Sequence, residues 1–114
     1  MHVEITHKIP QGKLVRISLD FDTTILQNIK ICGDFFIHPE ETIEEMERAL
    51  YHLPVETAET RIQQLLDRAV HTKNAQLIGV DTQNIAKLIH EAIYQWMKQK
   101  LLLWQTSGDL FHWK

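Results

Sequence analysis

The sequence predicts an α+β domain, in which a three-stranded antiparallel sheet is followed by three helices. In the first third of the chain apolar and polar residues alternate, which is the period of a half-buried strand. Further on, apolar residues recur every three or four positions, which is the period of an amphipathic helix. The length of 114 residues is that of one domain with one core. Strands and helices are therefore expected to pack together in a single unit.

The three strands are expected at the start of the chain. The first covers about residues 3–9, where the apolar residues share one parity. The second covers residues 14–21 and has the cleanest alternation. The third covers about residues 25–32, with Ile29 and Ile31 facing inward. Because short turns separate these segments, they are expected to pair in order as an antiparallel meander.

The three helices follow. Pro39 suits a first helical position, and glutamates follow it, so the first helix is expected over about 39–52. A second apolar stripe predicts a helix over about 56–71. Asp81 is a suitable N-cap for the third helix, which is expected to end near Leu103.

The domain is expected to cover residues 1–104. Residues 105–114 are expected to form a tail of unknown packing, with a break at Ser107-Gly108. The net charge of −3 and the lack of a Lys/Arg cluster argue against a nucleic-acid partner. The longest apolar cluster, Leu101 to Trp104, is too short to span a bilayer. The lone Cys32 and an N-terminus without a signal-peptide pattern indicate a cytoplasmic protein.

The sequence contains no recognisable catalytic constellation. Its histidines lack metal-ligand spacing, no Ser or Cys triad stands out, and no phosphate-binding glycine loop is present. We therefore expect the chain alone to bind no metal or cofactor and to be catalytically inert. Cys32-Gly33-Asp34 resembles a triplet of iron–sulfur scaffold proteins of the IscU type, but one thiol cannot hold a cluster.

Two segments instead suggest a binding surface, Gly12-Lys13 at the start of a strand and the loop Gly33-Asp34-Phe35-Phe36 that precedes the first helix. Strand parity makes Cys32 and Asp34 face away from the core and makes the two phenylalanines diverge. One of them is expected to pack in the core. The other is expected to face outward, as an anchor for a partner.

These segments resemble the small C-terminal domain of lipoate-protein ligase A, which in some archaea and bacteria is a separate accessory protein. Departures from the family are Cys32 and a Trp-bearing end after Lys98. The resemblance covers about residues 8–95 and rests on four stretches: Lys8-Ile9-Pro10-Gln11-Gly12-Lys13-Leu14-Val15-Arg16, Ile31-x-Gly33-Asp34-Phe35-Phe36, Pro39-Glu40-Glu41-x-Ile43-x-x-Met46-Glu47-x-x-Leu50, and Gly79-Val80-x-x-x-x-Ile85-Ala86.

The resemblance implies a SufE/NifU-like fold and a role as the non-catalytic subunit of a two-part ligase. A large catalytic subunit would hold ATP, Mg and lipoate and form lipoyl-AMP, while this chain would support that step by docking over the active site. Lys13 would contribute a cation near phosphate oxygens. Two alternatives remain open: a sulfur or iron–sulfur assembly factor that uses Cys32, and a stand-alone protein-interaction module.

Overall fold

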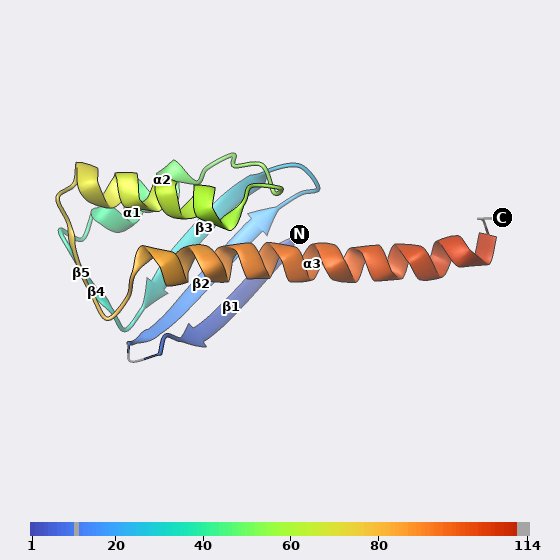
Figure 1. Cartoon of the computed structure of the whole chain (residues 1–114), viewed down its shortest axis with the longest axis horizontal. Helices are drawn as coiled ribbons and strands as arrows, with labels where there is room; N and C mark the ends of the chain where they lie inside the picture. The colour runs from blue at the N-terminus through green and yellow to red at the C-terminus, as the bar shows by residue number, and fades with distance from the viewer. Residues whose placement is uncertain (11, 112–114) are drawn as a thin grey trace.

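The computed structural model describes residues 1–10 and 12–111, with side chains to residue 98. Figure 1 shows a twisted sheet crossed by a long helix, with the other helices beside it. In chain order the elements are β1 (His2–Lys8), β2 (Leu14–Phe21), β3 (Leu26–Gly33), β4 (Phe36–His38), α1 (Thr42–Ala49), α2 (Glu59–Thr72), β5 (Gln76–Ile78) and α3 (Thr82–Phe111).

The predicted α+β fold with its antiparallel meander is confirmed. The strand order is β1–β2–β3, and both pairings are antiparallel. Ile17, in the middle strand, pairs with Ile5 of β1 and with Ile31 of β3. Because side chains alternate across a strand, one face of this sheet is apolar and the other carries charged and polar groups.

The helices cover the apolar face and close one core. Helix α3 packs on β1 and β2, α2 packs on α3, and α1 packs on α2 and on β3. The rings of Phe21 and Trp96 pack edge to face, with their centroids 4.8 Å apart and their planes at 89°. The largest fully buried side chains are Phe21, Ile17, Leu19, Leu26, Met46, Leu50, Ile62, Leu66, Ile85, Ile89, Val15 and Thr42.

Strands β4 and β5 were not predicted, and they pair with each other as a second, two-stranded antiparallel sheet. Each is only three residues long, so neither contains enough positions to show an alternation. Helix α1 also begins later than predicted. Residues 39–41 form a turn, in which the Thr42 N–H donates to the Pro39 carbonyl at 3.1 Å, so Pro39 precedes the helix.

Helix α3 begins where the sequence predicted. Asp81 caps it, because its Oδ1 accepts a hydrogen bond from the Asn84 N–H at 2.7 Å. The predicted end near Leu103 and break at Ser107-Gly108 are wrong, since α3 continues to Phe111. One glycine costs a helix only ~1 kcal/mol relative to alanine, which does not by itself end it.

The far half of α3 projects beyond the rest of the domain (Figure 1), and the molecule measures 56 × 26 × 20 Å. The side chains of the predicted tail, residues 105–114, lie outside the described residues, and so does their packing. Among the residues that the structure describes, no helix is both long and apolar enough to cross a membrane.

Candidate functional site

The two segments predicted as a binding surface meet at one end of the three-stranded sheet. Val15 pairs with Gly33, which places the start of β2 beside the end of β3. The Asp34 N–H donates to the Leu14 carbonyl at 3.0 Å and extends this contact by one residue. Gly12-Lys13 and Gly33-Asp34 are therefore neighbours in space, although they are twenty residues apart in sequence.

Gly79 completes this end of the sheet and was absent from the predicted site. Its carbonyl accepts a hydrogen bond from the Lys13 N–H at 2.9 Å. Its φ of +87° favours glycine, and a Cβ there would lie 2.5 Å from Lys13 Cγ. The Lys13 stem thus lies directly over Gly79. The signal that could have found it was Gly79-Val80, the fourth stretch of the family resemblance.

Two further glycines allow equally close backbone contacts. A Cβ on Gly33 would lie 2.1 Å from the Leu14 carbonyl oxygen, and one on Gly12 would lie 2.8 Å from the Gly79 carbonyl oxygen. Only a residue without a side chain fits at such distances. We call Gly12, Gly33 and Gly79 the glycine junction, because together they join the end of the main sheet to the β4–β5 pair.

The predicted divergence of the two phenylalanines is confirmed. Phe35 is 9% exposed and belongs to the core, whereas Phe36 is 70% exposed. Phe36 pairs across the small sheet with Ile78, which is itself 54% exposed. Two large apolar side chains therefore stand side by side on the open face of β4–β5. Exposed apolar pairs of this kind are common at binding surfaces.

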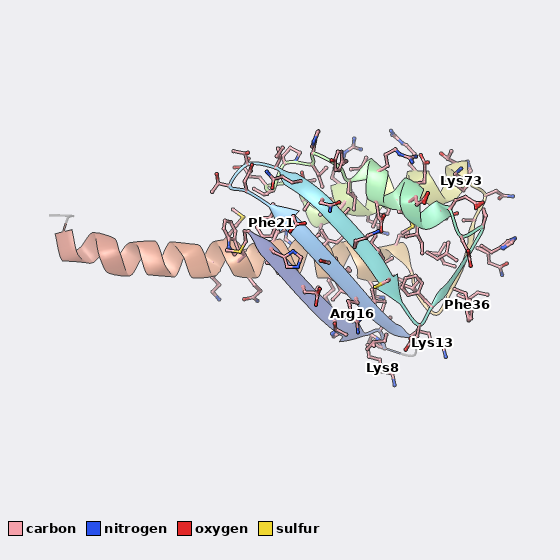
Figure 2. All side chains as sticks on the ribbon, turned by 180° about the vertical axis from the view of Figure 1, so that it is seen from behind. Lys8, Lys13, Arg16, Phe21, Phe36 and Lys73 are labelled. Atoms are coloured by element: carbon pink, nitrogen blue, oxygen red, sulfur yellow. The ribbon has the colours of Figure 1, made fainter. Side chains whose placement is uncertain are left out.

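Two lysines lie at the same end of the molecule as this apolar pair (Figure 2). Lys13 is exposed, and Lys8 is close to it because the Ile9 N–H donates to the Lys13 carbonyl. Figure 2 shows both lysines at the same end of the molecule as Phe36. Among the described residues neither ammonium forms an ion pair. We call Lys8, Lys13, Phe36 and Ile78 the docking surface. A role for these residues in binding stays a prediction.

Cys32 lies apart from the docking surface, in a groove of about 450 Å³ between the polar sheet face and α1. Its thiol is exposed. Arg16 is its partner across the strands, and Glu44 and Glu47 line the opposite wall. Among the described residues there is no cluster of His, Cys, Asp and Glu that could hold a metal ion.

A third polar group lies at the far end of the sheet. His2 Nδ1 is 2.6 Å from Asp20 Oδ1, and Ser18 Oγ is 3.3 Å from His2 Nε2. Ser18, His2 and Asp20 thus follow one another as the serine, histidine and aspartate of a hydrolase triad do. The side chains of His2 and Asp20, however, are 55% and 44% exposed. Catalytic triads act in sites that exclude water and fix the imidazole, so we interpret this set as a cross-strand contact.

Fold and site together define a small α+β domain whose conspicuous feature is an exposed docking surface. The model of the family "Bacterial lipoate protein ligase C-terminus" matches residues 1–89. A curated relative, "Lipoate-protein ligase A subunit 2" of Thermoplasma acidophilum, is 32% identical over 63 residues, which are 55% of this chain and 67% of the relative.

A solved chain from the archaeal lipoylation system of the same organism, a bi-partite lipoate protein ligase and its E2 lipoyl domain, has the same fold. It superimposes with a TM-score of 0.62 at 24% identity, over 78% of this chain and 97% of the solved one. This chain therefore belongs to the family of bacterial lipoate protein ligase C-terminal domains.

Proposed function

We propose that this chain is the accessory subunit of a two-part lipoate-protein ligase and supports the activation of lipoate to lipoyl-AMP by a separate catalytic subunit. Membership of the family supports the proposal, and so does the relative that is itself called subunit 2. The observation that carries it is the docking surface, where exposed Phe36 and Ile78 stand beside Lys13 at a junction of close backbone contacts.

The docking surface suits a supporting role. Burying Phe36 and Ile78 against the catalytic subunit would supply apolar contact area and exclude water from the interface. The glycine junction would hold the backbone of Lys13 in place through the Gly79 carbonyl. An ammonium placed in this way at the edge of the partner's active site stabilises phosphate oxygens, more strongly once water is excluded. ATP, Mg and lipoate would be bound by the catalytic subunit.

The alternative role of Cys32 in sulfur transfer fits the structure less well. The thiol lies on strand β3 and not at a helix N-terminus, where a thiolate is stabilised. Membership of a ligase family favours the first function over this one. The third possibility, an interaction module with an unrelated partner, shares the docking surface and is separated from the proposal by the experiment below.

The first prediction concerns reconstitution of the ligase. When this chain alone is incubated with ATP, Mg and lipoate, no lipoyl-AMP should form. Lipoyl-AMP should form once the catalytic subunit from the organism that encodes this chain is added. Lys13→Ala should leave binding and melting temperature unchanged but slow lipoyl-AMP formation about tenfold, the size of one charge-assisted contact. Quenched-flow assays with radiolabelled ATP measure this rate.

Lys87→Ala is the matched control, because Lys87 is an exposed lysine on α3 that is not part of the docking surface. It should leave the rate unchanged. The proposal is wrong if the chain forms lipoyl-AMP alone, or if the catalytic subunit is equally active with and without it. An equal loss of rate in both lysine variants would instead contradict the role of Lys13.

A further inference from the structure

The two edges of the three-stranded sheet differ in how their backbone groups are satisfied. On the outer edge of β3 the Ile31 N–H donates to the Glu47 carboxylate at 2.9 Å. On the same edge the Leu26 N–H donates to the Leu53 carbonyl at 2.7 Å. Both acceptors come from the segment that contains α1. Helix α1 and its following turn therefore close this edge against further strands.

The other edge is formed by β1, and two hydrogen bonds show which of its residues face outward. The Phe21 N–H donates to the Met1 carbonyl at 2.9 Å, and the Ile9 N–H donates to the Lys13 carbonyl at 3.1 Å. In this regular antiparallel ladder the odd residues of β1 thus bond to β2. The residues whose N–H and C=O groups point away from the sheet are His2, Glu4, Thr6 and Lys8.

Nothing in the described part of the chain covers these outward groups. No hydrogen bond reaches them, and Figure 1 shows β1 as the border of the sheet. The strand His2–Lys8 contains no proline and its register has no bulge, which are two usual means of protecting an edge. A regular edge of seven residues is a template for the addition of another strand.

We propose that the added strand is β1 of a second copy of this chain, paired antiparallel about Thr6. In this register Thr6 faces Thr6 of the second copy, and Glu4 faces Lys8 of the second copy. A two-fold axis relates the two copies, so the pair between Glu4 and Lys8 occurs twice. Two opposite-charge pairs therefore form on the polar face of the joined sheet. Threonine pairs and opposite-charge pairs are both favourable between neighbouring strands.

The sequence of β1 favours this register over the adjacent ones that also join outward groups. Pairing about Glu4 would place two glutamates opposite each other. Pairing about Ile5 would place Glu4 opposite Thr6 and His2 opposite Lys8, which leaves no opposite-charge pair between carboxylate and ammonium. Only pairing about Thr6 matches both Glu4 and Lys8 with a group of opposite charge. The charge pattern of β1 thus favours β1 of a second copy as the added strand.

The other face of β1 can accommodate the added strand. A groove of about 210 Å³ lies along β1 beneath α3, lined by Val3, Glu4, Ile5, Ala92, Gln95 and Trp96. In the proposed register Ile5 faces His7 of the second copy on this side. The added strand therefore extends the floor of the groove, and the result is a continuous six-stranded sheet shared by two copies.

The inference does not rest on the proposed function, and it is tested on this chain alone. Analytical ultracentrifugation from micromolar to near-millimolar concentration should show a reversible monomer–dimer equilibrium. Glu4→Lys turns both pairs into Lys–Lys contacts and should raise the dissociation constant about tenfold. Lys8→Glu should do the same. The double variant Glu4→Lys/Lys8→Glu restores both pairs and should return the constant to that of the natural chain.

The matched controls are Glu91→Lys and Lys87→Glu, which make the same charge changes at exposed positions on α3. They should leave the dissociation constant unchanged. Amide hydrogen exchange supplies a second readout. The amides of Glu4, Thr6 and Lys8 should exchange more slowly as protein concentration rises, while those of Val3, Ile5 and His7 should be protected at every concentration.

Three results would overturn the proposal. The first is a monomer at all concentrations. The second is a dimer that the charge variants leave unaffected, which would place the contact elsewhere, for example on the projecting half of α3. The third is protection of the Glu4, Thr6 and Lys8 amides only after the catalytic subunit is added, which would make the added strand part of that subunit.

Discussion

Phe35 and Phe36 are chemically identical, and only the backbone separates their environments. Phe35 contacts the glycine junction, where a Cβ on Gly33 would lie 2.9 Å from its ring. Phe36 follows as the first residue of β4, and its side chain points to the opposite side. The sequence predicted this divergence but not which residue would be buried, because that depends on the unpredicted strand β4.

The two phenylalanines should therefore respond differently to truncation. Phe35→Ala opens a cavity and should lower the free energy of unfolding by about 3 kcal/mol. Phe36→Ala should change it by less than about 0.5 kcal/mol, yet weaken binding of the catalytic subunit by about 2 kcal/mol. Thermal melts and calorimetric titration measure the two effects, with Tyr94→Ala as the control because Tyr94 is 56% exposed on α3. If both phenylalanine variants melt early and their folded fraction binds normally, Phe36 is no anchor.

At the scale of elements, the sequence predicted what is periodic and missed what is short or set by distant contacts. Strand β2 was predicted with its observed bounds, because eight alternating residues leave no ambiguity. The start of α1 was predicted three residues early, since a proline and glutamates suit a turn as well as a first helical turn. Gly79 could not be placed from sequence, because its neighbour Lys13 is more than sixty residues away.

The contact between these two residues can be tested. Gly79→Ala should destabilise the domain by more than ~1 kcal/mol, because it adds the cost of a positive φ to a clash with the Lys13 stem. In a Lys13→Ala background the Cγ atom is gone and the nearest atom of residue 13 is its Cβ, at 3.3 Å, so the cost should fall toward the backbone cost of ~1 kcal/mol. Urea unfolding of the natural chain, the two single variants and the double variant gives this double-mutant cycle. An equal cost in both backgrounds would show that the Lys13 stem does not lie over Gly79 in solution.

At the scale of the whole molecule, the core and the family match end well before the last helix does. The family model covers residues 1–89, whereas α3 runs to Phe111. The buried residues of α3 end at Ile93, and Trp96 and Met97, which are partly buried, are the last described side chains that pack against the core. The projecting half of α3 is thus an addition to a domain whose core is already enclosed by the strands, α1, α2 and the first half of α3.

Removal of residues 99–114 should therefore leave that core intact. Among the side chains that the structure describes, all those in the core precede the cut, so the melting temperature should change by no more than a few degrees. The far-ultraviolet helical signal should fall by about a quarter, because residues 99–111 make up that share of the helical residues. Since β1 is untouched, the shortened chain should also keep the dimerisation proposed above. A large drop in melting temperature would mean that the projecting half of α3 packs back onto the domain, and loss of the dimer alone would move the contact from β1 to that helix.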